Sequence, residues 1–234
     1  MIPLKNALHS SVGKKFIMAL TGLALVLFVI VHLLGNLSLY LPDGIHFNQY
    51  AAALQNLGGL LIIGEVGLVF MFLIHIVTAL QVTKRNRAAR PEGYKYYKTK
   101  GGPTKSNLSS RSMIYSGLVL LGFLILHIWQ FKFGPGVSMG YVQTVSGAEI
   151  RDLHRLVVET FKNPLFVVIY VAAMLFLGTH LRHGFWSAFQ SLGANNPRLT
   201  RSLSVIGSLI ALILAVGFLF IPVWIYFDLS GVLK

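Results

Sequence analysis

Five stretches of the chain are apolar and nearly free of charge, and each is long enough to cross a membrane. A membrane-spanning helix needs about 20 consecutive, mostly apolar residues. The stretches are 16–40, 60–83, 112–131, 164–187 and 202–227. They predict an all-α membrane protein with five transmembrane helices, in which 1–234 forms a single transmembrane domain. The first stretch is too long for a signal peptide and has no small-residue cleavage site behind it, so we expect it to remain as a span.

The composition supports this prediction and excludes several kinds of functional site. Only 12% of the 234 residues are charged, whereas a soluble domain carries about 25%. The chain has no cysteine, which excludes disulfides, cysteine-ligated zinc, iron–sulfur clusters and thiol nucleophiles within it. It also lacks the glycine-rich and HExxH motifs of nucleotide-binding proteins and zinc proteases.

The net charge of +13 is concentrated on one predicted side of the membrane. Most lysines and arginines fall in the N-terminal segment, in the loop 84–111 and around 182–201. By the positive-inside rule, the protein lies in the cytoplasmic (inner) membrane with its N-terminus in the cytoplasm and its C-terminus outside. The basic loop 84–111 either contacts anionic lipid headgroups or docks a cytoplasmic partner. We expect no nucleic-acid partner.

Two segments between the spans resemble short surface helices on the outer side. Phe47, Tyr50 and Leu54 recur at helical spacing in the first. In the second, Ser146 and Glu149 match a capping box ahead of the apolar residues of 150–161. We expect both helices to lie at the membrane interface.

Each of the first four spans contains one interior histidine: His32, His75, His127 and His180. Ionisable side chains are costly in hydrocarbon and usually face the interior of a helix bundle. With a rise of about 1.5 Å per residue, His75 and His180 lie at one level, ~10–12 Å from the cytoplasmic boundary. His32 and His127 share the other level, ~6–12 Å from the outer boundary. In an up-down four-helix bundle, each pair would face across the core.

Paired imidazoles at two levels predict two stacked b-type haems, because two trans histidines complete a six-coordinate haem iron. Cations near the inner boundary would bind the propionates, and the candidates are Lys14, Lys15, Arg182 and His183. His183 also competes with His180 for the ligand role. Glu65, the one acidic residue inside a span, is a candidate for proton exchange with a quinone, with a structural hydrogen bond as the alternative.

The sequence resembles the b558-type dihaem cytochrome b anchor of succinate dehydrogenase and fumarate reductase. The resemblance covers nearly the whole chain, including the number of spans and the one histidine in each of four. It rests on the segments SVGKKF at 11–16, TG at 21–22, HLLGNL at 32–37, FNQY at 47–50 and HLRHGFWSAFQ at 180–190.

The resemblance implies a membrane anchor for a flavoprotein subunit that carries FAD and an iron–sulfur subunit. It implies a proximal haem on His75 and His180, a distal haem on His32 and His127, and electron exchange between succinate chemistry and a quinone, often menaquinone. The chain itself would be the quinone-reacting subunit of the enzyme, with no dicarboxylate site of its own. The direction of the reaction stays open.

Two other classes also stay open. One is the cytochrome b anchor of another quinone-linked dehydrogenase. The other is a transporter without haem, in which the histidines and Glu65 form a proton relay.

Overall fold

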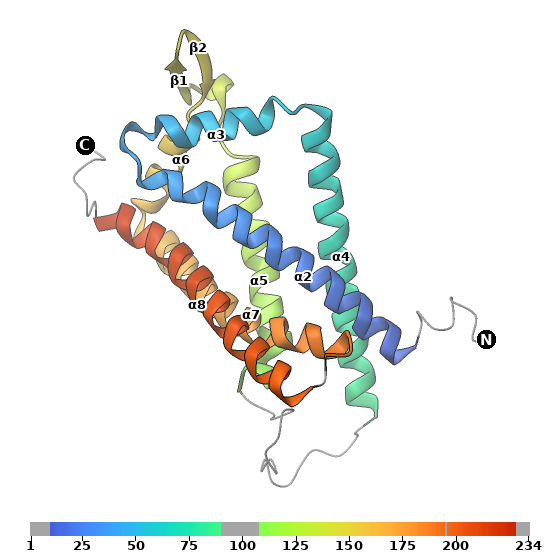
Figure 1. Ribbon diagram of the computed structural model, residues 1–234. Coiled ribbons are helices and arrows are strands. Elements are labelled where there is room, and N and C mark those ends of the chain that lie inside the picture. The colour runs from blue at the N-terminus through green and yellow to red at the C-terminus, as the bar shows by residue number, and fades with distance from the viewer. Residues whose placement is uncertain (1–9, 90–107, 195, 228–234) are drawn as a thin grey trace. The chain divides into compact units, whose positions relative to one another are not determined.

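The computed structural model describes residues 10–89, 108–194 and 196–227, and its long helices are drawn in Figure 1. They are α2 (Ser11–Asn36), α4 (Gly59–Ala88), α5 (Leu108–His127), α7 (Pro164–Ser191) and α8 (Pro197–Phe227). Within the described residues, five helices are long and apolar enough to cross a membrane. The prediction of five helices of membrane-spanning length is therefore confirmed. Much of the basic loop 84–111 lies outside the described residues.

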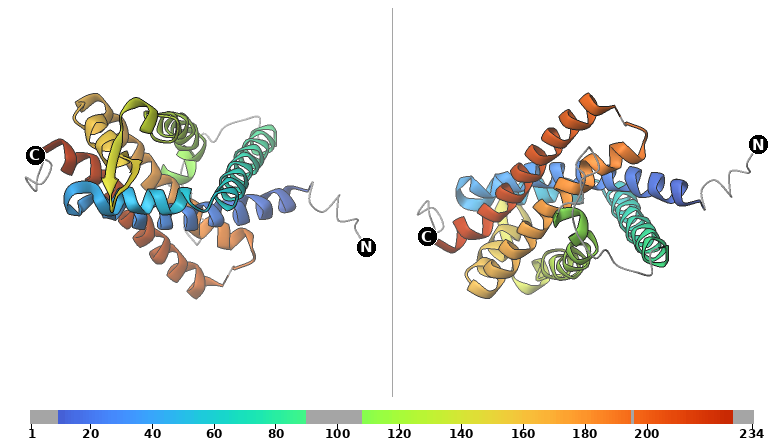
Figure 2. Two further views of the ribbon diagram at one scale, coloured as in Figure 1. Left: turned by 90° about the horizontal axis from the view of Figure 1, so that it is seen from above. Right: turned by 90° about the horizontal axis from the view of Figure 1, so that it is seen from below.

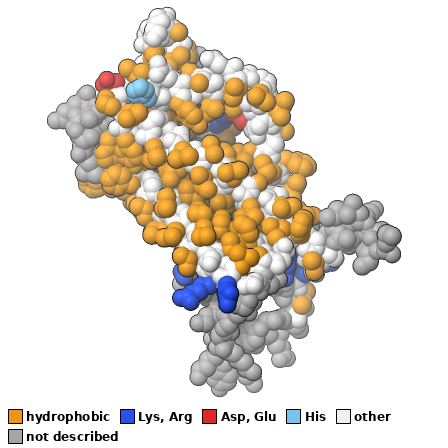
Figure 3. All heavy atoms as spheres, viewed as in Figure 1, with side chains coloured by type: hydrophobic (Ala, Val, Ile, Leu, Met, Phe, Trp, Pro, Cys, Tyr) orange, Lys and Arg blue, Asp and Glu red, His pale blue; other side chains and the backbone are white. Residues whose placement is uncertain are grey.

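The membrane-length segments extend somewhat beyond the predicted ranges. Their bounds are Ser11–Tyr40, Gly59–Ala88, Ser112–Lys132, Pro164–Ser191 and Arg198–Phe227. The extensions contain polar and charged residues, which an apolar run cannot predict but a hydrogen-bonded helix tolerates near its ends. Many apolar side chains of these helices are exposed, among them Ile63 at 70%, Leu27 at 63% and Leu212 at 59%, and Figure 3 shows one face covered with hydrophobic side chains. Such a surface suits lipid rather than water.

Local signals set the ends of α7 and α8. The side chain of Asn163 accepts a hydrogen bond from the backbone N–H of Leu165 (2.9 Å), and Asn196 does the same for Arg198 (2.9 Å). These are the N-cap bonds that satisfy the free N–H groups of a first helical turn. Gly193, at φ +98°, follows the end of α7, and the N–H of Ala194 bonds back to Phe189 O (3.0 Å). Glycine is favoured there because it adopts left-handed backbone without strain.

The chain divides into two compact units. Unit 1 comprises Met1–Phe28, Gly67–Leu118 and Gly178–Leu212. Unit 2 comprises Val29–Val66, Val119–Leu177 and Ile213–Lys234. Each unit thus contains parts of several long helices, while the short elements between α2 and α4 and between α5 and α7 belong to unit 2.

Those short elements of unit 2 form a cap. It consists of α3 (Ile45–Gln55), the antiparallel strands β1 (Val142–Val145) and β2 (Ala148–Arg151), and α6 (Leu153–Phe161). Strand residues Val142 and Val145 pair with Arg151 and Ala148. α3 contacts both strands and α6, and the views in Figures 1 and 2 agree that it runs beside the hairpin.

Asn48 on α3 joins the parts of the cap through its side chain, which is fully buried. Its amide nitrogen donates to Gln143 Oε1 and to Asp152 Oδ1, both at 2.8 Å. Its amide oxygen accepts from the backbone N–H of His154, also at 2.8 Å. One side chain therefore links α3 to β1 and to the start of α6.

The structure corrects the predicted capping box. Ser146 lies in the hairpin turn at φ +52°, and Glu149 lies in strand β2, paired with Thr144. α6 begins instead after Asp152, whose side chain accepts from the N–H of Arg155 (3.0 Å). Because β1 and β2 pair with each other, the residues that match a capping box form a hairpin and not the start of a helix. The apolar side of α6, with Leu156, Val157 and Phe161, is buried in the protein. The helix expected from Phe47, Tyr50 and Leu54 is present as α3.

Acidification below pH 6.5 should loosen the cap. The ring of His154 lies against Gly44, and burial lowers its pKa from the ordinary 6.5, with Asp152 and Asp43 acting in the opposite direction. An opened cap therefore binds a proton at His154 more readily than the closed one. The free energy of opening falls as the pH drops below 6.5 and levels off below the lowered pKa.

Hydrogen exchange of the amides of 45–55 at pH 7.5 and 5.5, corrected for intrinsic rates, measures this effect. Protection should be lower at pH 5.5, and His154→Gln should remove most of the difference. His46→Gln, a change at an exposed histidine of the same cap, serves as the control. Equal corrected protection at both pH values would contradict the expectation.

Candidate functional site

Unit 2 brings two of the predicted site histidines together. The rings of His32 on α2 and His127 at the end of α5 lie with their centroids 5.7 Å apart and their planes at 87°, an edge-to-face contact. Phe123, one turn before His127, stacks on its ring at 5.7 Å. Phe218 of α8 lies 5.7 Å from the ring of His32. The two imidazoles thus sit in an aromatic setting inside the spans.

A chain of hydrogen bonds extends from His127. Its Nδ1 lies 3.3 Å from the hydroxyl of Tyr170 on α7, and that hydroxyl donates to Gln130 Oε1 at 2.7 Å. Gln130 and Tyr170 are both buried, with 9% and 6% of their surfaces exposed. Gln130 belongs to a π-helical turn, Ile128–Lys132, that continues α5. Such turns are rare and recur at functional sites, because they redirect side chains.

Unit 1 holds the other two histidines, each bonded through Nδ1 to a neighbouring helix. Nδ1 of His75 on α4 lies 3.2 Å from the backbone oxygen of Met18 and 3.4 Å from the hydroxyl of Thr21, both on α2. A Cβ at Gly22 would come within 3.1 Å of the His75 ring. The glycine therefore allows the imidazole to approach the backbone of α2 closely.

His180 on α7 makes the corresponding contact with α5. Its Nδ1 lies 3.0 Å from the hydroxyl of Ser116, which is 1% exposed. His183, one turn later, has a buried Nδ1 without a hydrogen-bond partner among the described residues, and its ring meets Trp186 edge to face at 5.7 Å. A helix-to-helix bond thus distinguishes His180 from His183, its predicted competitor.

The cations predicted to bind propionates lie in unit 1, with Lys14 half-buried and Lys15 and Arg182 exposed. None of the three forms an ion pair with another described residue. Glu65, in unit 2, forms an ion pair with Lys132 at the end of the π-helical turn, and the two side chains are 40% and 49% exposed. Because both side chains are part-exposed, the carboxylate is accessible to other partners.

The prediction of two haem groups is wrong. Within the described ranges, no group of three or more histidine, cysteine, aspartate or glutamate side chains is placed to hold a metal ion. The physical reason lies in what surrounds the imidazoles. His32 and His127 meet each other and aromatic rings, His75 and His180 meet hydroxyl and carbonyl groups, and Glu65 is paired with Lys132. The position of each histidine within its span does not reveal these neighbours.

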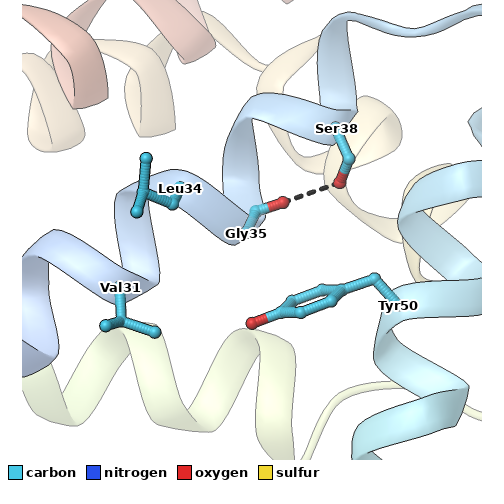
Figure 4. A pocket seen from close by; sticks show the side chains of 5 residues that line it. All are labelled: Val31, Leu34, Gly35, Ser38 and Tyr50. Atoms are coloured by element: carbon cyan, nitrogen blue, oxygen red, sulfur yellow. Dashed lines mark hydrogen bonds between the residues drawn. The ribbon is translucent and has the colours of Figure 1, made fainter.

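A small groove lies at the end of α2 in unit 2, and its residues are drawn in Figure 4. Its volume of about 340 Å³ is lined by Val31, Leu34, Gly35, Ser38 and Tyr50. Pockets for small molecules measure roughly 300–1,000 Å³. The Tyr50 ring lies against Gly35, where an added Cβ would come within 2.6 Å of ring carbon Cε1. The hydroxyl of Ser38 bonds to Gly35 O and closes the helix end (2.6 Å).

Sequence reasoning assigned no role to the polar residues that contact the histidines directly or, for Gln130, through Tyr170. Thr21, Ser116, Gln130 and Tyr170 are polar side chains within or next to apolar spans, which is a weak signal by itself. Gln130 and His127 are three residues apart, but the π-helical turn that directs Gln130 to Tyr170 cannot be read from the sequence. Lys132, the ion-pair partner of Glu65, has no sequence feature that predicts this pairing.

Comparison of the chain with protein-family models, with curated proteins and with solved structures found no match. The functional interpretation therefore depends on the residues of the two units and on the sequence resemblance.

Proposed function

We propose that the chain is the membrane-anchor subunit of a succinate:quinone oxidoreductase, at which partner subunits exchange electrons with membrane quinone. The observation that carries the proposal is the arrangement of the interior histidines. Four separate spans each contribute one; His75 and His180 belong to unit 1, and His32 and His127 belong to unit 2. Polar groups in spans mark functional positions, because burying them without a role is costly.

The partners in this proposal are a flavoprotein subunit and an iron–sulfur subunit on the cytoplasmic side. Oxidation of succinate to fumarate releases two electrons and two protons, and reduction of a quinone to its hydroquinone takes up the same number. The complex can work in either direction. Glu65 is the side chain we assign to the proton exchange, because a carboxylate at a quinone site accepts and releases protons.

The test is purification of the full chain from its own membranes in mild detergent. We expect two larger subunits to co-purify, with bound flavin by fluorescence and iron–sulfur clusters by electron paramagnetic resonance, and with succinate-dependent reduction of a quinone analogue. Glu65→Gln should lower quinone reduction at least tenfold while succinate oxidation by an artificial dye continues. Glu149→Gln, a change at an exposed carboxylate of β2, is the matched control. A chain that purifies alone and active in another assay would refute the proposal.

A second candidate function is a proton-relay transporter. The hydrogen-bonded chain from His127 through Tyr170 to Gln130 favours it, since it extends a polar path inside the spans. This candidate predicts proton flux across liposomes containing only this chain, measured with a pH-sensitive dye. The anchor proposal predicts none.

The topology in the proposal places the N-terminus in the cytoplasm and the cap outside. The natural absence of cysteine makes single-cysteine labelling free of background. We expect a membrane-impermeant maleimide to label Ser138→Cys, next to the cap, in intact cells. Ser11→Cys, at the start of α2, should be labelled only after the membrane is permeabilised. The reverse pattern would show the opposite orientation.

A further inference from the structure

The interior histidines with described ring hydrogen bonds all use the same nitrogen. His75, His127 and His180 each place Nδ1 at a protein partner, at 3.2, 3.3 and 3.0 Å. The partners come from three different neighbouring helices: Met18 of α2, Tyr170 of α7 and Ser116 of α5. Three separate contacts thus share one chemical pattern.

Each of these partners is arranged to accept a proton rather than to donate one. A carbonyl oxygen such as that of Met18 has no proton. The hydroxyl of Ser116 already donates to the backbone oxygen of Met113 (3.1 Å), and that of Tyr170 donates to Gln130 Oε1 (2.7 Å). Since a hydroxyl carries a single proton, its remaining capacity is as an acceptor. The proton of each contact must therefore come from the imidazole Nδ1.

We propose that Tyr170 and Ser116 are positioning residues that hold His127 and His180 as the Nδ1–H tautomer, as the Met18 carbonyl holds His75. A neutral imidazole with its proton on Nδ1 carries a lone pair on Nε2. In each of the three side chains, Nε2 is therefore the nitrogen that can accept a hydrogen bond. This inference does not depend on the proposed succinate:quinone function.

Tyr170 is held firmly enough to impose a tautomer. Its ring meets Phe123 and Phe161 edge to face, with centroids 4.9 Å away in both cases. The π-helical turn Ile128–Lys132 positions Gln130, whose side-chain oxygen takes the Tyr170 proton. The hydroxyl cannot turn to donate to His127 without giving up its bond to Gln130.

Solid-state nitrogen NMR of the full chain in lipid bilayers tests the proposal. With ¹⁵N-labelled histidine and ¹³C-labelled tyrosine, a through-space correlation to the tyrosine Cζ identifies His127 Nδ1. At pH 8, we expect this nitrogen to be protonated and Nε2 of the same ring to be unprotonated. Tyr170→Phe should remove the preference and produce an Nε2–H population for His127, and Ser116→Ala should do the same for His180. Tyr50→Phe removes a hydroxyl that contacts no described histidine ring, so it should change no histidine signal.

Two outcomes would overturn the proposal. One is a wild-type His127 protonated on Nε2, a result that needs no variant and so does not depend on how the variants fold. The other is a Tyr170→Phe protein that keeps the His127 tautomer unchanged. Neither result bears on whether flavin and iron–sulfur subunits co-purify, so the two proposals fail independently.

Discussion

Asn48→Leu is expected to destabilise the cap by about 3–5 kcal/mol, the largest effect that we expect of a single substitution in this chain. Leucine has nearly the same size but neither donates nor accepts, so it breaks all three side-chain bonds of the fully buried Asn48. The N–H of His154 loses its partner, and Gln143 Oε1 and the Asp152 carboxylate each lose one of their hydrogen bonds. Buried polar groups left without partners cost about 1–3 kcal/mol each.

Hydrogen exchange of α3 and α6 in detergent or bilayers measures this loss. The slow amides of 45–55 and 153–161 should exchange more than a hundredfold faster, since every 1.4 kcal/mol is a factor of about ten. Gln49→Leu, at the exposed neighbouring position, introduces the same side chain and should leave exchange nearly unchanged. Similar protection in Asn48→Leu and wild type would show that Asn48 does not hold the cap together.

Gly134→Ala is expected to destabilise the end of the π-helical turn by about 3 kcal/mol. An added Cβ would overlap the backbone oxygen of Gln130 and come within 3.2 Å of Leu156 Cδ2. Backbone cannot move aside as a flexible side chain can. Relief would shift the carbonyls of Gly134 and Pro135, which accept from Arg151 at 3.1 and 3.0 Å, and would displace Gln130 from Tyr170.

Exchange rates of the amides of 128–134 and of α6 report this change, and they should rise together. Gly64→Ala is the matched control, because nothing lies within 4 Å of its added Cβ. Alanine is preferred over glycine inside a helix by about 1 kcal/mol, so this control should be neutral or stabilising. A neutral Gly134→Ala would mean that the turn can open without affecting α6.

The cap shows where sequence patterns are sufficient and where they fail. The helix at 45–55 follows from apolar residues at helical spacing. Of these residues, Phe47 is buried, whereas Tyr50 and Leu54 are 40% and 36% exposed. The Ser146–Glu149 pattern failed because two short strands pair across a tight turn, and Ser146 and Gly147 adopt positive φ values of 52° and 81° to form it. Asp152 is also an N-cap signal in the sequence, but the prediction followed the Ser146–Glu149 pattern instead.

The candidate site shows the same limit. One histidine in each of four spans could be read directly from the sequence. The edge-to-face contact of the His32 and His127 rings is seen only in the structure. The haem prediction assumed that each pair of imidazoles faces a haem. In the structure, the imidazoles face aromatic rings, hydroxyl groups and a carbonyl group. The pairing of Glu65 with Lys132, separated by 67 positions, and of Tyr170 with Gln130, separated by 40, depends on how the helices pack.

The sequence by itself determined the five membrane-length helices of this protein. In hydrocarbon, every backbone N–H and C=O must be satisfied within the segment, so an apolar run of sufficient length has little choice but to form a helix. Only the tertiary structure decided the partners of the interior side chains. His75, His127 and His180 bond to groups 57, 43 and 64 positions away, and such contacts depend on the rotation and depth of each helix, which hydrophobicity constrains only weakly.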